Sequence, residues 1–124
     1  MERRSVYSTY LRAVVGTTEC DCLLDTGSEA SLLPAAMVDP SVIVRTSQTL
    51  KAANGTIIPI LGEASVKMKI GLFETTISGL VSEHISEVML GIDWLTSNGV
   101  IWEFERSRWK ILTPVCEIWR YRVV

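Results

Sequence analysis

The segment Cys22-Leu23-Leu24-Asp25-Thr26-Gly27-Ser28 carries the most informative residues of this chain. An apolar run ends directly at an aspartate, and a threonine, a glycine and a serine follow it. Acidic residues between a strand and a glycine turn commonly cap that turn or a following helix. The tripeptide Asp25-Thr26-Gly27 is therefore weak evidence alone, and its meaning depends on what surrounds it.

A second segment of this kind lies downstream, at Val88-Met89-Leu90-Gly91-Ile92-Asp93-Trp94-Leu95. It predicts a short apolar strand, a glycine and a helix over 93–97 that ends at Asn98-Gly99. Taken alone, this is an ordinary corner between a strand and a helix, with Gly91 allowing close backbone approach. Asp93 at the start of the helix is expected to be stabilised by the helix dipole.

The remainder of the chain has the pattern of a mainly β domain, with turn residues at short intervals between runs rich in Val, Ile, Leu and Thr. One hairpin is predicted from strands 6–15 and 19–24, and another from strands 42–53 and 57–61 around Asn54-Gly55. Pro59 places its strand at an edge or in a projecting hairpin. Further strands are predicted over 63–70, 73–81, 88–90, 100–104 and 109–112, with a weak last one within 113–124.

Composition excludes several classes of protein. A chain of 124 residues fits one domain, and 48% hydrophobic with 21% charged residues is typical of a folded globular protein. A net charge of −2 gives no basic surface for nucleic acid, and no apolar run reaches the roughly 20 residues of a membrane span. Three cysteines without a signal peptide predict reduced thiols in an intracellular, cytoplasmic protein. With one histidine, no metal or cofactor is expected.

The order of these segments resembles the retropepsins, the single-domain aspartic proteases of retroviruses and LTR retrotransposons, and is similar to the retropepsin-like domain of cellular ubiquitin-shuttle proteases. The resemblance rests on 25–28, the hairpin at 52–56 and the segment 89–95, and covers about residues 6–112. It implies a mainly β fold: a closed β-barrel-type half of an acid protease, with a flap hairpin and one short helix, paired as a homodimer. The protease domain is expected over residues 1–112, with 113–124 as a C-terminal tail or linker strand.

The resemblance also implies roles for individual residues. Asp25 would be catalytic, and the active-site loop would be supported by Thr26, Gly27 and Ser28. Glu29 would contact the substrate backbone, and the flap tip would be formed by Ala53, Asn54, Gly55 and Thr56. Leu90 and Gly91 would lie behind the active-site loop. Neither a metal nor a cofactor is implied.

Peptide hydrolysis of this kind needs two carboxyl groups around one water: one takes the proton of the water, and the other protonates the carbonyl oxygen. Of the four aspartates, only Asp25 begins an Asp-Thr-Gly motif, so a two-fold homodimer would supply the second carboxyl group. The expected activity is that of an aspartic endopeptidase that cuts an extended peptide, such as a retroelement polyprotein. The alternative is a non-catalytic, domesticated module of the same fold that dimerises or binds peptides.

Overall fold

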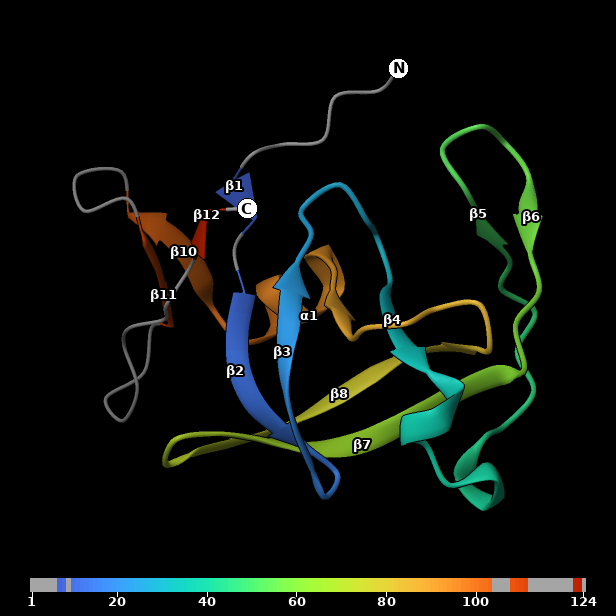
Figure 1. Ribbon diagram of the computed structural model, residues 1–124, viewed down its shortest axis with the longest axis horizontal. Coiled ribbons are helices and arrows are strands. Elements are labelled where there is room, and N and C mark those ends of the chain that lie inside the picture. The colour runs from blue at the N-terminus through green and yellow to red at the C-terminus, as the bar shows by residue number, and fades with distance from the viewer. Residues whose placement is uncertain (1–6, 9, 104–107, 112–121, 124) are drawn as a thin grey trace.

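Figure 1 shows the computed structural model of the chain, in which residues 7–8, 10–103, 108–111 and 122–123 are described. Its centre is a closed barrel of six strands in the spatial order β2-β3-β9-β4-β8-β7. Those strands are β2 (Tyr10–Val15), β3 (Thr18–Leu24), β4 (Ser31–Pro34), β7 (Gly62–Ile70), β8 (Phe73–Ser82) and β9 (Met89–Leu90). The short helix α1 (Ile92–Ser97) follows β9. The expectation of a mainly β fold with a closed barrel and one short helix is confirmed for the described residues.

Two long hairpins form most of the barrel wall: the first was predicted as a hairpin, and the second was predicted as two separate strands. β2 pairs with β3 up to Val15 and Thr18, and β7 pairs with β8 up to Ile70 and Phe73. The turns contain Gly16 and Gly71, whose φ angles of 65° and 61° lie in the region that favours glycine. Along β7 the side chains alternate, so that one face packs into the barrel and the other carries exposed Ser65, Lys67 and Lys69.

The core fills the inside of this barrel. Its largest fully buried apolar side chains come from β4, β7, β8 and β9 and include Leu33, Met68, Ile77 and Leu90. α1 covers one opening, because Trp94 and Leu95 on its inner face are buried. Asn98 ends the helix, where its side-chain amide donates to the carbonyl of Trp94 at 2.9 Å.

β9 has a central place in the sheet because it lies between β3 and β4. It runs parallel to β3, with Leu24 opposite Leu90, and antiparallel to β4, with Met89 opposite Leu32. The end of β3, the start of β4 and the start of α1 consequently meet at one end of the barrel. This is the end at which the Asp-Thr-Gly segment lies.

The predicted strand over 42–53 is wrong, and its partner is shorter than predicted. The flap hairpin consists only of β5 (Leu50–Lys51) and β6 (Ile57–Ile58), and Pro59 lies beyond β6. Two short 3₁₀ helices, η1 (Ala35–Met37) and η2 (Pro40–Val42), precede the hairpin. Pro40 begins η2 after Asp39, whose carboxylate accepts the Ser41 N–H, and this turn occupies the start of the predicted strand.

β4 was not predicted from the sequence, although all of its residues are buried. Four residues between a loop and a 3₁₀ helix give too short a run for the alternation of a strand to show. The strand exists because β8 and β9 pair with its two edges, which a local pattern does not reveal.

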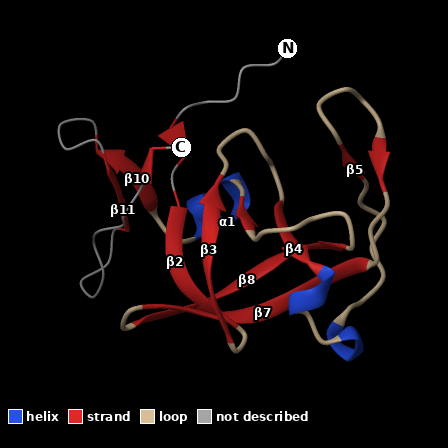
Figure 2. Cartoon of the chain, viewed as in Figure 1, coloured by secondary structure: helices blue, strands red, loops and turns tan. Residues whose placement is uncertain are grey.

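The last hairpin and the terminal strands lie beside the barrel (Figure 2). β10 (Val100–Glu103) pairs with β11 (Arg108–Ile111) with Trp102 opposite Trp109, which confirms the strands predicted over 100–104 and 109–112. β1 (Tyr7–Ser8) pairs with β12 (Arg122–Val123). Most of the predicted tail strand, residues 113–121 and 124, lies outside the described residues, and the domain boundary at 112 stays a prediction. No helix of the described residues has the length and apolar character needed to cross a bilayer.

Candidate active site

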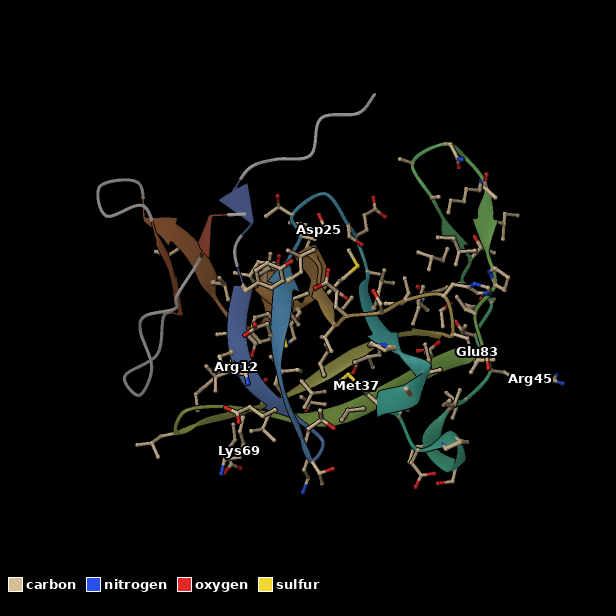
Figure 3. All side chains as sticks on the ribbon, viewed as in Figure 1. Arg12, Asp25, Met37, Arg45, Lys69 and Glu83 are labelled. Atoms are coloured by element: carbon tan, nitrogen blue, oxygen red, sulfur yellow. The ribbon has the colours of Figure 1, made fainter. Side chains whose placement is uncertain are left out.

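Asp25 is the first residue after β3, at the end of that strand opposite the β2–β3 turn (Figure 3). Its backbone N–H donates to the carbonyl of Leu90 at 2.9 Å, which continues the pairing of β3 with β9 by one step. Its carboxylate Oδ1 accepts the N–H of Gly27 at 3.0 Å, and its carbonyl accepts the N–H of Ser28 at 3.2 Å. The Gly27 N–H thus holds one oxygen of the carboxylate, and the half-buried side chain remains partly accessible to solvent.

The residues after Asp25 form the tight active-site loop, defined here as residues 25–31. A Cβ atom at Gly27 would lie 3.3 Å from Asp25 Oδ1, so a side chain there would press against the carboxylate. The Ser28 hydroxyl donates to the carbonyl of Ala30 at 2.6 Å, which fixes the second half of the loop. Thr26 is exposed, and its hydroxyl makes no hydrogen bond within the described residues.

Gly91 lies where β9 passes directly behind this loop. A Cβ atom there would be 2.7 Å from the carbonyl oxygens of both Ser28 and Ala30, so only glycine fits without displacing the loop. The next residue, Ile92, donates its N–H to the Ser28 carbonyl at 2.8 Å. Leu90 and Gly91 therefore lie directly behind residues 25–31.

Asp93 binds the far end of the loop. Its carboxylate accepts the Ser31 hydroxyl at 2.8 Å and the Ser31 N–H at 3.2 Å, and it also accepts the N–H of Trp94 at 2.6 Å. The Ser31 hydroxyl in turn accepts the N–H of Gly91 at 3.0 Å. Asp93 does lie in the first turn of α1, as predicted, and it has this second partner as well.

Sequence reasoning missed Ser31. Its only local signal is that it is a small polar residue just before the apolar Leu32-Leu33 pair, and it proves to be 0% exposed. A buried hydroxyl needs a hydrogen-bond partner, which would have prompted a search for one. The partner itself, 62 residues away, could not be identified from the pattern.

A cavity of about 560 Å³ lies beside the loop. One wall is formed by the loop residues 27–30, and the opposite wall by residues 48–51, which lead into and form β5. Leu80 and Asp93 complete the lining. Of the predicted site residues, the cavity thus brings together Gly27, Ser28 and Glu29. The Glu29 side chain makes no hydrogen bond or ion pair with another described residue.

The predicted flap tip stands away from this cavity. The hairpin of β5 and β6 projects from the barrel (Figure 1), and its tip residues Ala53, Asn54, Gly55 and Thr56 are exposed and do not line the cavity. The turn is closed by hydrogen bonds from Gly55 N–H to the Ala52 carbonyl at 2.9 Å and from Thr56 N–H to Asn54 Oδ1 at 2.9 Å. Asn54-Gly55 does form the predicted turn, with φ of 89° at Gly55.

The two cysteines of β3, Cys20 and Cys22, precede Asp25 by five and three residues and face the same side of the strand, as predicted. Their sulfur atoms are 4.0 Å apart and both thiols are free. Burial raises the pKa of both thiols above the ordinary value and most strongly that of Cys22, so both stay protonated near neutral pH. Within the described ranges, no group of three or more His, Cys, Asp or Glu side chains is placed to hold a metal ion.

Comparison with known proteins gives a clear result for the fold. No sequence profile of a protein family matches the chain, and no curated protein matches it by sequence. Among solved structures, the retroviral protease-like domain of Ddi1 from Leishmania major matches with a TM-score of 0.71 and 10% identity, over 94% of this chain and 95% of that one.

Two viral enzymes match as well. The protease of EIAV, solved with the inhibitor HBY-793, has a TM-score of 0.55 and 22% identity over 78% of this chain and 89% of that one. The protease of Simian Foamy Virus (mac) has a TM-score of 0.51 and 16% identity over 70% of this chain and 91% of that one. At these identities the likeness concerns the arrangement of the backbone. The chain therefore has the retropepsin-like fold of the retroviral protease-like domains.

Proposed function

We propose that this chain is an aspartic endopeptidase that acts as a homodimer, with Asp25 of each copy as the catalytic residue. The observation that carries this proposal is the half-buried Asp25 carboxylate, held by the Gly27 N–H at 3.0 Å, at the start of a loop whose residues 27–30 line a cavity together with residues 48–51. Two of the proteins that share the fold are viral proteases, which supports the same reading.

In a two-fold dimer the two Asp25 carboxyl groups share one proton, because two carboxylates about 3 Å apart cannot both ionise. The ionised group takes a proton from a water held between them, and the water oxygen attacks the peptide carbonyl carbon. The protonated group gives its proton to the carbonyl oxygen. The carboxyl group that took the water proton then gives it to the amide nitrogen, the other carboxylate takes the proton of one hydroxyl of the tetrahedral intermediate, and the C–N bond breaks.

The dimer is part of the proposal because one chain supplies one suitable carboxyl group. Asp93, the other acidic residue in contact with the loop, is engaged by Ser31 and the helix start, and it serves as an acceptor there. Thr26, whose hydroxyl has no partner in the described part of the chain, is available to bond across the two-fold axis. Thr26, Gly27 and Ser28 support the loop in this proposal.

The substrate of this proposed enzyme is an extended polypeptide in the cavity between residues 27–30 and 48–51, in contact with Glu29. The flap tip at 53–56 closes over it, since the hairpin is exposed and joined to the barrel only at its base. We place the enzyme in the cytoplasm, where its thiols stay reduced, and infer that its natural substrate is a retroelement polyprotein.

The test is cleavage of an unfolded protein substrate by wild type and by Asp25→Asn from mildly acidic to neutral pH. Asp39→Asn is the matched control, because it removes an exposed carboxylate that also accepts a backbone N–H but precedes η2, outside residues 25–31. We expect activity in wild type and Asp39→Asn, and at least about 10³-fold less in Asp25→Asn.

Dimerisation is tested by dilution, because activity per chain must fall once the concentration drops below the dissociation constant of the dimer. Full activity in Asp25→Asn would refute the proposal. A folded, dimeric wild type that cleaves nothing would favour the non-catalytic module that dimerises or binds peptides.

A further inference from the structure

One corner of the fold holds the active-site loop along its whole length. Four consecutive residues, 90–93, each make a hydrogen bond to the loop. These bonds join Asp25 N–H to Leu90 O (2.9 Å), Gly91 N–H to Ser31 Oγ (3.0 Å), Ile92 N–H to Ser28 O (2.8 Å), Asp93 N–H to Glu29 O (3.3 Å) and Ser31 O–H to Asp93 Oδ1 (2.8 Å). Residues 90–93, at the end of β9 and the start of α1, thus act as a backbone template for the loop.

Ser31 is the residue on which the far end of this template depends. Its hydroxyl accepts a hydrogen bond from Gly91, between β9 and α1, and donates one to Asp93 of α1, and the side chain is 0% exposed. Without the hydroxyl, the buried Gly91 N–H loses its partner, and Asp93 Oδ1 keeps only the Trp94 N–H. Ser31 does not line the cavity, so it has no route to the substrate except through the loop.

We propose that Ser31 and Asp93 are positioning residues that fix the active-site loop. They hold the two Asp25 carboxyl groups of the dimer close enough to share a proton. The inference rests on the proposed function, because it concerns the geometry of that dyad. The loop is anchored at its start by the bond from Asp25 to β9 and at its end by Ser31 and Asp93. Releasing one anchor lets Asp25 move relative to its copy.

A change in the separation of the carboxyl groups has a specific signature in the pH profile. Their mutual repulsion splits the two apparent pKa values of the pair. At an effective dielectric constant near 20, an increase in separation from about 3 to about 4 Å brings the two values closer by about one pH unit. The pH profile of kcat/KM therefore narrows when the loop is loosened.

The best variant for this test is Ser31→Ala, because it changes no charge. The charged groups on the loop and on the elements around it all remain in place: Glu29 on the loop, Asp93 on α1, Lys51 on β5, and Arg12, Glu19 and Asp21 on β2 and β3. A narrower profile cannot then be attributed to the loss of a neighbouring charge.

Ser82→Ala is the matched control. Ser82 is also 0% exposed, and its hydroxyl likewise donates once, to the Pro59 carbonyl at 2.8 Å, and accepts once, from the His84 N–H at 3.0 Å. Both variants lose one buried hydroxyl bonded on two sides, so their losses of stability are comparable. Only Ser31 touches the template of the loop.

We expect Ser31→Ala to lower kcat by about 10- to 100-fold with KM changed less than about threefold, since the defect is in the orientation of the catalytic group. Its kcat/KM profile should narrow by about half a pH unit or more, and that of Ser82→Ala should keep the width of wild type. Asp93→Asn keeps the side-chain shape and one acceptor oxygen. Its kcat and the width of its kcat/KM profile should therefore lie between those of wild type and Ser31→Ala. Equal widths in Ser31→Ala and Ser82→Ala would overturn the inference.

A second measurement decides the inference without any enzyme activity. Amide hydrogen exchange in the full chain reports the bonds of Asp25 N–H and Ile92 N–H, which tie the loop to the corner. In Ser31→Ala or Asp93→Asn these amides should exchange at least about tenfold faster than in Ser82→Ala, at equal global stability. Equal exchange rates would overturn the positioning role. Absence of cleavage by wild type would instead overturn the proposed function, and the exchange result would still stand.

Discussion

Replacing Gly91 by alanine is the sharpest test of how the active-site loop is packed. The new Cβ atom would lie 2.7 Å from the carbonyl oxygens of Ser28 and Ala30, whereas ordinary contacts begin near 3.4 Å. The two backbone segments must therefore separate by about 0.7 Å. Both oxygens belong to the backbone, which cannot rotate aside as a long side chain can. The φ angle of −90° at Gly91 suits alanine, so the whole cost comes from this collision.

The magnitude follows from two terms. Overpacking of a tight site costs about 1–3 kcal/mol, and a separation of 0.7 Å would stretch the 2.8 Å bond from Ile92 N–H to the Ser28 carbonyl to about 3.5 Å, which loses about 1 kcal/mol more. Alanine returns about 0.5–1 kcal/mol by stiffening the unfolded chain. The net expectation is a loss of about 1–3.5 kcal/mol in the free energy of unfolding.

The assay is urea unfolding followed by tryptophan fluorescence, at one fixed protein concentration so that dimerisation does not differ between samples. Gly71→Ala is the control, because it puts a Cβ atom into open space at a φ of 61° and costs about 1 kcal/mol from backbone strain alone. If Gly91→Ala is no less stable than Gly71→Ala, the close packing of β9 behind the loop is not what the structure indicates.

Two further predictions concern the thiol of β3 and the flap. Burial raises the pKa of Cys22 above the ordinary 9.0, so at higher pH the unfolded chain loses a proton that the folded chain keeps, and stability falls by up to about 1.4 kcal/mol per pH unit. Between about pH 9 and 10.5, the urea midpoint should therefore fall less steeply with rising pH in Cys22→Ala than in wild type. The same dependence on pH in both proteins would contradict this prediction. Gly55→Val distorts an exposed flap turn with a φ of 89°. We expect kcat/KM to fall about tenfold, while the melting temperature changes by only a few degrees. An unchanged kcat/KM would show that the flap tip does not contribute to substrate binding.

Much of the barrel could be predicted because its main hairpins have a local cause. Alternating side chains over 63–70 and the glycine turns at Gly16 and Gly71 specify which residues pair and which face is buried. The same holds for the site, since the strand that ends at Asp25 and the glycine at 91 are both visible in the sequence. Their mutual position followed from a resemblance to a known family, and the structure bonds Asp25 to Leu90 and packs Gly91 against the loop that follows Asp25.

The segment before the flap was mispredicted because β-branched residues alone do not make a strand. Val42 and Val44 are 46% and 57% exposed, so burial does not stabilise an extended ladder there. Among the described residues, Val44 finds a single partner, Glu63, at the start of β7. Elsewhere β7 is already paired with β8 along its length and with β2 near its other end. A continuous strand did not form over 42–53 because neighbouring strands offered too few free edges for pairing. Amino-acid composition does not reveal whether such an edge is free.

The bonds between Ser31 and the β9–α1 corner also set an order of events during synthesis. They join residues 60 and 62 positions apart, so the active-site loop closes only after nearly the whole barrel has been made. A nascent chain that ends before residue 89 carries the complete Asp25-Thr26-Gly27 motif without the strand that shapes it. If the chain emerges as part of a longer polypeptide, the proposed cutting activity would begin only after this domain has left the ribosome and folded, which would delay cleavage of the precursor.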